Sequence, residues 1–214
     1  MNNLNEVEQK IAESLLQIKA IKLQPKNPFT WASGWKSPIY CDNRITLSHP
    51  AIRTYIRQKL SQLIQEEFGT VEMISGVATA GIPQGVLVAQ DLGLPFTYVR
   101  SSAKGHGRQN LIEGEVVSGQ RVVVIEDLIS TGKSSLQAVE ALREAGCNVV
   151  GLVSIFTYGF DAAVNNFAEA KCPFFSLCNY DALIKVAVTN SYVLESDVAL
   201  LEQWRRDPSN WTGE

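Results

Sequence analysis

The stretch Gln120–Ser135 reads QRVVVIEDLISTGKSS, and its parts belong to successive elements of structure. It opens with a run of β-branched residues, Val122–Ile125, which predicts a strand buried on both faces, as in a parallel sheet. Glu126 and Asp127 follow at once. A small polar loop then leads into a helical pattern of apolar residues that ends at Gly146. The predicted order is therefore strand, acidic pair, loop and helix.

The loop in this stretch has the composition of a phosphate-binding site. Backbone N–H groups at a helix start have no partner within the helix, and the helix dipole adds positive charge there. Gly132 lets the backbone approach a ligand closely. Four hydroxyl side chains add further donors: Ser130, Thr131, Ser134 and Ser135. The pattern therefore indicates a seat for a phosphate monoester.

The acidic pair points to a second part of the same ligand. Carboxylates repel phosphate but accept hydrogen bonds from hydroxyl groups, so Glu126 and Asp127 suit a sugar diol beside the phosphate. A P-loop is excluded, because that motif requires Gly five residues before Gly132, where this chain has Asp127. The plain alternative is an ordinary strand–turn–helix unit with solvated carboxylates. A sugar phosphate is the ligand that we expect.

The flanking sequence predicts an α/β fold with a mostly parallel sheet flanked by helices, and with a small N-terminal hood. We expect residues 1–48 to form an N-terminal helix and the hood. Residues 49–214 are expected to form the catalytic core, the whole being effectively one domain. Further elements are predicted as follows: helices over 5–20, 49–68, 83–92, 161–170, 180–187 and 196–206; strands over 71–77, 94–100, 149–158 and 173–177; a hairpin of 115–117 with 121–126; and a frayed tail from Pro208.

Two other segments have functional patterns. Residues 78–81, Ala-Thr-Ala-Gly, follow a strand and precede a helix, so a second anion seat and simple tight packing are both open. Residues 101–113 read SSAKGHGRQNLIE, which is polar and holds two glycines. Basic residues gather there without an acid before Glu113, which predicts a mobile cationic lid rather than a solvated hairpin tip. A dinucleotide fingerprint fails, because no third glycine follows and no helix opens there.

The N-terminal stretch Phe29–Ser48 is aromatic-rich and reads as short strands and turns, with β-type residues at 39–41 and 45–47. Its aromatic residues could build a flat pocket for a planar anionic ring. They could equally be core or dimer-interface residues, and composition alone leaves this open. Arg44 is suited to grip a carboxylate in a forked geometry.

Composition excludes several classes. The 214 residues include 19 basic and 22 acidic side chains, a net charge of 19 − 22 = −3, without a basic block, so we expect no nucleic-acid partner. We also expect no membrane segment and no signal peptide. The four cysteines have no zinc-ligand spacing and only two histidines are present, so we expect no protein-held metal cluster and read the thiols as buried in a cytoplasmic protein.

The strand, two adjacent acids and Thr/Gly-rich loop of residues 120–135 resemble the 5-phosphoribosyl 1-pyrophosphate (PRPP) motif of type I phosphoribosyltransferases. FTWASGWKSPIYCDNR, residues 29–44, is similar to the hood segment of the orotate phosphoribosyltransferases in particular. The resemblance runs from Pro28 to about Ala187 and includes Tyr180–Leu183. It departs at Glu126, where many members have Asp, and at Ser101, which is often Lys.

The resemblance implies transfer of ribose 5-phosphate from PRPP to orotate, with Mg²⁺ held mainly by PRPP and no separate metal ligands. It implies a homodimer whose lid loop reaches the neighbouring subunit. Lys104, His106 and Asp127 would be catalytic, and Ser130 would also contact orotate, with Arg44 our own candidate for the orotate carboxylate. The implied PRPP-binding residues are Arg100, Lys104, His106, Glu126, Asp127, Leu128, Ile129, Ser130, Thr131, Gly132, Lys133 and Ser134. A purine-type phosphoribosyltransferase and a non-enzymatic PRPP-sensing regulator are the alternatives.

Overall fold

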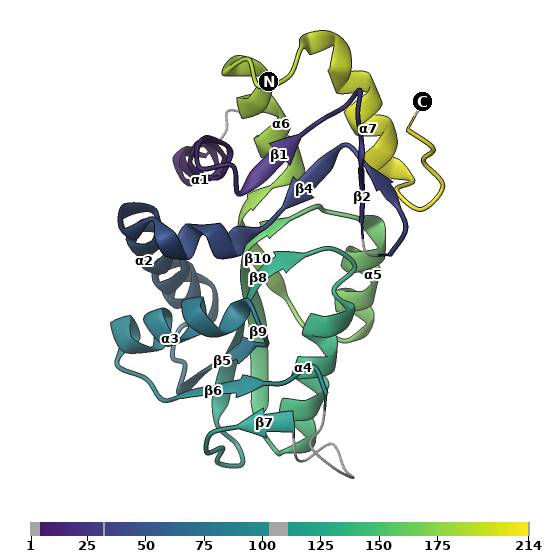
Figure 1. The fold of residues 1–214 in the computed structure, drawn as a ribbon. Coiled ribbons are helices and arrows are strands. Elements are labelled where there is room, and N and C mark those ends of the chain that lie inside the picture. Colours follow the sequence, from purple (N-terminus) through teal and green to yellow (C-terminus); the bar gives the residue numbers. More distant parts are fainter. Residues whose placement is uncertain (1–4, 32, 103–110, 214) are drawn as a thin grey trace. The chain divides into compact units, whose positions relative to one another are not determined.

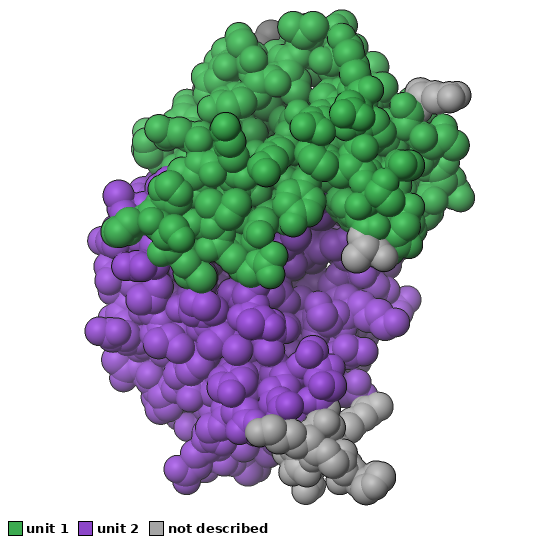
Figure 2. Space-filling model, in the orientation of Figure 1, with its two compact units in different colours: residues 1–50, 178–214 green, residues 51–177 purple. Residues whose placement is uncertain are grey.

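The computed structural model describes residues 5–31, 33–102 and 111–213. The chain separates into two units (Figure 2): residues 1–50 together with 178–214 form unit 1, and residues 51–177 form unit 2. The lid residues Lys104, His106 and Arg108, on which the sequence analysis placed a cationic cluster, lie outside the described residues.

A six-stranded sheet is the centre of unit 2, in the order β10-β9-β8-β5-β6-β7 (Figure 1). β5 pairs in parallel with β6 and β8, β8 pairs in parallel with β9, and β7 is antiparallel to β6. The predicted α/β fold with a mostly parallel sheet is confirmed. The strands are β5 (Met73–Val77), β6 (Phe96–Val99), β7 (Ile112–Glu113), β8 (Arg121–Ile129), β9 (Asn148–Thr157) and β10 (Phe174–Asn179).

The central strand β8 is longer than its apolar run suggests. Val122–Ile125 is fully buried, as expected for a strand with parallel neighbours on both sides. Pairing with β9 then continues, with Glu126 opposite Ser154 and Ile129 opposite Thr157. The acidic pair was predicted to follow the strand, but it lies inside it, because pairing with the long strand β9 continues through Ile129.

Helices cover both faces of this sheet. They are α2 (Pro50–Phe68), α3 (Gly81–Leu92), α4 (Lys133–Glu144) and α5 (Asp161–Glu169). Figure 1 shows α3 and α4 on opposite faces, and α5 packs beside α4. This follows from right-handed crossovers, because β5 to β6 and β8 to β9 step in opposite directions across the sheet. Ligands bind at such a reversal of strand order in open α/β sheets.

The predicted hairpin of residues 115–117 with 121–126 is wrong. Residues 115–117 are not in a strand, and the short strand that precedes them, β7, pairs with β6 instead. β8 has β5 on one side and β9 on the other, so no edge is open to a hairpin partner. A turn does form at Ser118–Gly119, where Gln120 N donates to the Val117 carbonyl at 3.2 Å. It leads the chain into β8 without pairing two strands.

Unit 1 combines both ends of the chain. Its elements are α1 (Glu6–Gln17), β1 (Ile21–Leu23), β2 (Phe29–Thr30), β3 (Lys36–Ser37), β4 (Ile39–Cys41), the 3₁₀ helices η1 (Asn43–Ser48) and η3 (Glu195–Asp197), α6 (Tyr180–Thr189) and α7 (Val198–Arg206). β1 pairs with β4 and β2 with β3, both antiparallel. Asn5 caps α1 by accepting from Val7 N at 2.8 Å, and the buried face of α1 packs on α6.

Two predictions in unit 1 are corrected. Ile45–Leu47 was expected to be β-type but lies in the 3₁₀ helix η1, which Asp42 begins by accepting a bond from Arg44 N at 3.2 Å. This local side-chain cap outweighs the β propensity of the three residues. The tail from Pro208 was expected to fray, yet Trp211 is only 7% exposed. Burial of its large ring holds the tail against unit 1.

Candidate active site

The loop between β8 and α4 builds a hollow at the start of a helix. Gly132 is the N-cap of α4 with φ +76°, a left-handed conformation that favours glycine. α4 begins at Lys133, and its N-cap makes no side-chain hydrogen bond, so no N-cap side chain covers the backbone N–H groups of the first turn. A cavity of about 350 Å³ is lined by Leu128, Ser130–Ser135 and Gln137. The predicted phosphate-loop residues are thus brought together.

The loop is held from behind by neighbouring elements. Asn166 in α5 donates from Nδ2 to the Thr131 carbonyl at 3.0 Å. Tyr158 N donates to the Ile129 carbonyl at 3.1 Å, just after the end of β9. These bonds satisfy loop carbonyls and leave the N–H side of the loop for an anion. The loop is therefore preorganised for an anion.

Glu126 and Asp127 differ sharply in environment. Glu126 is 5% exposed, and its Oε2 accepts from the Ser135 hydroxyl at 3.1 Å while its Oε1 accepts from Asp127 N at 3.1 Å. Burial, and next the neighbouring negative charge of Asp127, raise the pKa of Glu126 well above its ordinary value. Asp127 is half-buried. A side-chain hydrogen bond with Asp127 also raises the pKa of Glu126, so the two carboxyl groups are in contact with each other.

A second cavity lies between the ends of parallel strands and α4. Its volume is about 310 Å³, and its lining includes Ala78 after β5, Arg100 after β6, and Ser134 in α4. The Arg100 guanidinium is paired with Glu113, Nη1 to Oε1 at 3.4 Å, and Arg100 N donates to the Leu111 carbonyl at 2.8 Å. Because Ser134 also lines the phosphate-loop cavity, the two cavities flank the first turn of α4.

The loop at residues 78–81 shows why its residues are small. A Cβ atom on Gly81 would collide with the carbonyl oxygen of Ile125, and one on Gly76 would lie 2.9 Å from the Gly81 carbonyl oxygen. Glycine at these positions is therefore required for close packing of α3 on β5 and β8. The start of α3, which has no side-chain cap, nevertheless opens near the second cavity through Ala78.

In unit 1, the predicted orotate residue Arg44 already has a carboxylate partner. Its Nε and Nη2 contact the two Asp42 oxygens at 2.6 and 3.0 Å, and this ion pair lowers the pKa of Asp42. The aromatic residues of the hood form a cluster. Trp31 stacks on Trp35, with ring centroids 6.4 Å apart, and meets the buried Trp204 edge-on at 5.7 Å. Trp31 therefore belongs at least in part to the core of this unit.

Metal and membrane features are as follows. Among the described residues, no group of three or more His, Cys, Asp or Glu side chains is arranged to hold a metal ion. In the described part of the chain, no helix has the length and apolar character needed to span a bilayer. Cys41, Cys147, Cys172 and Cys178 are free thiols, and the last three are buried.

The structural roles of three site residues were not predicted from the sequence. Asn166 and Phe167 lie in α5, which is distant in sequence from the phosphate loop. Asn166 bonds the Thr131 carbonyl, and the ring of Phe167 lies against Gly132. Nothing in their local sequence pattern predicts these contacts. Ser135 was counted among the loop hydroxyls, but it is 1% exposed and bonded to Glu126. Helical spacing offered a signal, because Ser135 is three residues before the buried Ala138 and four before Val139.

Comparison with known proteins gives consistent results. Residues 45–186 match the phosphoribosyl transferase domain family. The chain is 58% identical to the orotate phosphoribosyltransferase of Phocaeicola vulgatus, over 96% of this chain and 97% of that protein. It is 53% identical to the orotate phosphoribosyltransferase of Listeria innocua, over 96% and 98%.

Solved structures agree. The crystal structure of orotate phosphoribosyltransferase from Aeropyrum pernix matches with a TM-score of 0.74 and 27% identity, covering 86% of this chain and 99% of that one. The structure of Leishmania donovani UMP synthase matches with a TM-score of 0.77 and 28% identity, covering 92% of this chain and 42% of that one.

Proposed function

The chain belongs to the orotate phosphoribosyltransferase family, and we propose that it transfers ribose 5-phosphate from PRPP to orotate. Pyrophosphate leaves and orotidine 5′-monophosphate forms, a step of pyrimidine biosynthesis. The observation that carries this proposal is the junction of β8 and α4, where an acidic pair directly precedes a helix-start loop. Relatives that carry the same name over nearly the whole chain support the choice of orotate as the acceptor.

The 5′-phosphate is proposed to bind the hollow at the start of α4. Backbone N–H groups from Ile129 to Ser134, with the hydroxyls of Ser130 and Thr131, supply donors, and Lys133 adds a positive charge at the first helical position. Leu128 lines the same cavity. The glycine at the N-cap supports this assignment, because its left-handed φ turns the chain sharply into the helix at the hollow.

The ribose hydroxyls are proposed to bind the acidic pair. Asp127 is half-buried and accepts from a hydroxyl at the strand end. Glu126 bonds Ser135, Asp127 N and the Asp127 side chain, so the two acids are proposed to meet the sugar hydroxyls as a linked pair. The acids thereby hold the sugar in register with its phosphate.

The pyrophosphate is proposed to lie over the second cavity, beside Arg100 and the loop at residues 78–81. Lys104 and His106, whose structure is not described, would add positive charge from the lid. Mg²⁺ is proposed to arrive bound to PRPP, because Mg²⁺ prefers phosphate oxygens, water and one or two carboxylates. When bound, it neutralises charge that develops on the leaving pyrophosphate.

The chemistry needs no covalent nucleophile. The C1–oxygen bond to pyrophosphate breaks as the orotate nitrogen approaches, so C1 acquires oxocarbenium character that water would also capture. A closing lid that excludes water therefore fits the reaction, and Arg100, Lys104 and His106 are assigned to stabilise the leaving group electrostatically. Ser130 is assigned a contact with orotate. Arg44 is assigned the orotate carboxylate, which would have to replace Asp42 on its Nε and Nη2 groups to be bound in a forked geometry.

We further propose that the enzyme is a cytoplasmic homodimer whose lid loops are exchanged between subunits. The buried free thiols Cys147, Cys172 and Cys178 support a reducing compartment. On either side of the lid segment, Arg100 N donates to the Leu111 carbonyl at 2.8 Å.

The test is the loss of orotate ultraviolet absorbance on mixing the purified protein with PRPP and Mg²⁺, with adenine, guanine and uracil as parallel acceptors. Consumption of orotate alone, stopped by EDTA, is the expected result. Consumption of a purine instead would mean that the acceptor is that purine and not orotate. Binding of PRPP without consumption of any base would mean that the protein is a PRPP-sensing regulator and not an enzyme.

A further inference from the structure

Ser135 has an environment unlike that of the other loop hydroxyls. Ser134 and Lys133 in the same turn of α4 are exposed, whereas Ser135 is 1% exposed. Its hydroxyl donates to Oε2 of Glu126 in β8 at 3.1 Å. A buried hydroxyl that lost this bond would be left without that acceptor away from water, so the bond is costly to break. This bond joins the helix that begins at the phosphate loop to the strand that carries the acidic pair.

The bond also acts on the ionisation of the carboxylate, as the smallest of several effects. Burial and the charge of Asp127 disfavour the ionised form of Glu126, while the bond from Ser135 acts in the opposite direction. Only an ionised carboxylate keeps all its oxygen lone pairs as acceptors. Asp127 N holds the other oxygen, Oε1, so the plane of the Glu126 carboxylate is determined from both sides.

Resting on the proposed function, we infer that Ser135 is a positioning residue that orients Glu126 toward the ribose hydroxyls and couples the sugar subsite to the phosphate subsite. The phosphate is bound by the first turn of α4 and the sugar by the end of β8. The Ser135–Glu126 bond spans these two elements next to both subsites. The bond therefore raises the affinity for a ligand that has both a phosphate and a sugar, and it does not raise the affinity for phosphate alone.

The experiment compares two ligands on the purified full chain by calorimetry: inorganic phosphate and ribose 5-phosphate. Ser135→Ala should weaken the binding of ribose 5-phosphate about tenfold, the upper range for the loss of one hydrogen bond, and should change phosphate binding less than about twofold. The matched control is Ser75→Ala, which removes another fully buried hydroxyl, one that accepts from Thr97 Oγ1 at 3.1 Å. It should alter neither ligand.

Two further variants test the route of the effect. In a Glu126→Gln background, Ser135→Ala should add less than about twofold to the loss of ribose 5-phosphate affinity, because residues that act through one contact are non-additive. Ser135→Cys, whose thiol is a weaker donor, should fall between Ser and Ala, and it replaces the alanine variant if that variant does not fold.

Several outcomes would overturn the inference. An equal loss of phosphate and ribose 5-phosphate affinity would mean that Ser135 only shapes the helix start. Unchanged binding of both, or fully additive effects with Glu126→Gln, would remove its positioning role. A wild-type protein that binds ribose 5-phosphate yet never consumes orotate would refute the proposed function while the binding ratio still tests Ser135.

Discussion

Gly132 lies so close to the ring of Phe167 that a Cβ atom on it would come 2.5 Å from Cε2 of the phenylalanine. Phe167 is itself 2% exposed and packs against Phe174 with ring centroids 4.3 Å apart, so it has little room to withdraw. The phosphate loop therefore rests directly on the hydrophobic core. The curvature of the loop and the packing of α5 depend on the same residue.

Gly132→Ala should therefore damage both stability and ligand binding. The left-handed φ of +76° and the contact with Phe167 both oppose a methyl group. We expect a loss of about 2–4 kcal/mol in unfolding free energy, measured by urea denaturation, and weaker PRPP binding. Gly93→Ala is the control, because Gly93 has φ +67° but nothing within 4 Å of a Cβ atom. An equal loss in both variants would assign the effect to backbone strain alone.

Asp127→Asn should lower turnover by about 100-fold or more and leave the fold intact, because the amide presents an N–H where the sugar hydroxyls need an acceptor. Circular dichroism and the thermal midpoint report the fold, and orotate absorbance reports the turnover. Full activity in this variant would remove Asp127 from the sugar site.

Glu126→Gln should stabilise the protein at alkaline pH. The folded-state pKa of Glu126 is raised above its ordinary value of 4.5, so the folded state holds the proton more tightly than the unfolded chain does. The wild-type protein therefore loses stability from Glu126 as pH rises above 4.5 through the folded pKa. At pH 8 the variant should have a Tm higher by at least about 2 °C, and the gain should vanish toward pH 4. A gain in Tm that grows toward acid pH would contradict the predicted pH dependence.

Mixing two inactive variants tests the exchanged lid. Lys104→Ala should depress turnover more than stability. If the lid serves the neighbouring subunit, a mixed dimer of Lys104→Ala and Asp127→Asn contains one site with both native residues. Equal mixing, after reversible dissociation, should then restore up to about a quarter of wild-type activity. Each homodimer treated alone is the control, and no recovery in the mixture would mean that each lid closes over its own subunit.

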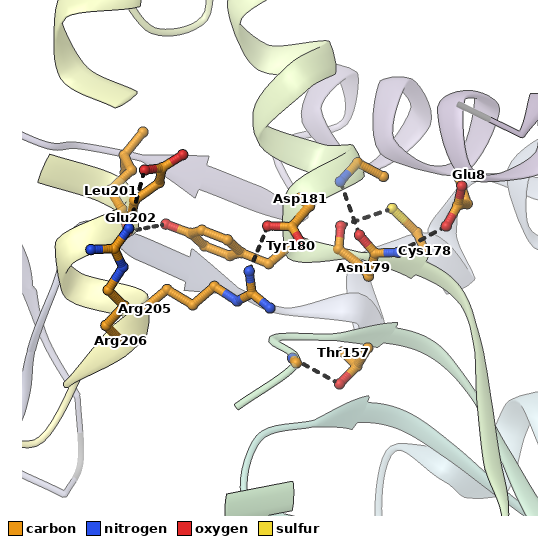
Figure 3. A network of polar contacts seen from close by, with 12 residues as sticks. Glu8, Thr157, Cys178, Asn179, Tyr180, Asp181, Leu201, Glu202, Arg205 and Arg206 are labelled. Atoms are coloured by element: carbon orange, nitrogen blue, oxygen red, sulfur yellow. Dashed lines mark hydrogen bonds and ion pairs between the residues drawn. The ribbon is translucent and has the colours of Figure 1, made fainter. Parts of the chain in front are cut away.

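Tyr180→Phe tests the polar network of unit 1. Figure 3 shows Tyr180 and Asp181 at the start of α6 directed toward α7, where the Tyr180 hydroxyl donates to the Leu201 carbonyl at 3.0 Å. Arg205 pairs with Asp181 at 2.6 Å. Loss of the buried hydroxyl should cost about 1 kcal/mol in thermal unfolding, because it leaves the Leu201 carbonyl without this partner. Asp181→Asn, at a more exposed pair, should cost less.

Sequence reasoning succeeded where a single stretch holds all the information. The β-branched run of β8, the loop composition and the stop at Gly146 lie within one continuous segment. The order strand, loop and helix could therefore be predicted from residues 120–146. It failed where partners are distant. The pairing of β7 with β6 rather than β8 depends on β5 and β9 occupying both edges of β8, and the support that Asn166 gives Thr131 depends on α5.

The acidic pair illustrates the same limit at the level of one residue. Two adjacent carboxylates look equivalent in the sequence, but the alternation of a strand gives them different surroundings. Glu126 is buried against Ser135 and Asp127 is only half-buried. That difference arises because β9 continues the ladder past Ile125, which is a property of the partner strand and not of the acidic residues.

The joining of residues 1–50 with 178–214 in unit 1 has a consequence for synthesis on the ribosome. The apolar face of α1, with Ile11 and Leu15 fully buried in the finished protein, packs on α6, which is translated long after it. Throughout elongation of unit 2 that face lacks its main partner, α6, and has only the nearby strand β1. The nascent protein therefore presents an exposed amphipathic helix for most of its translation, a natural target for chaperones and for premature association between neighbouring chains on one message.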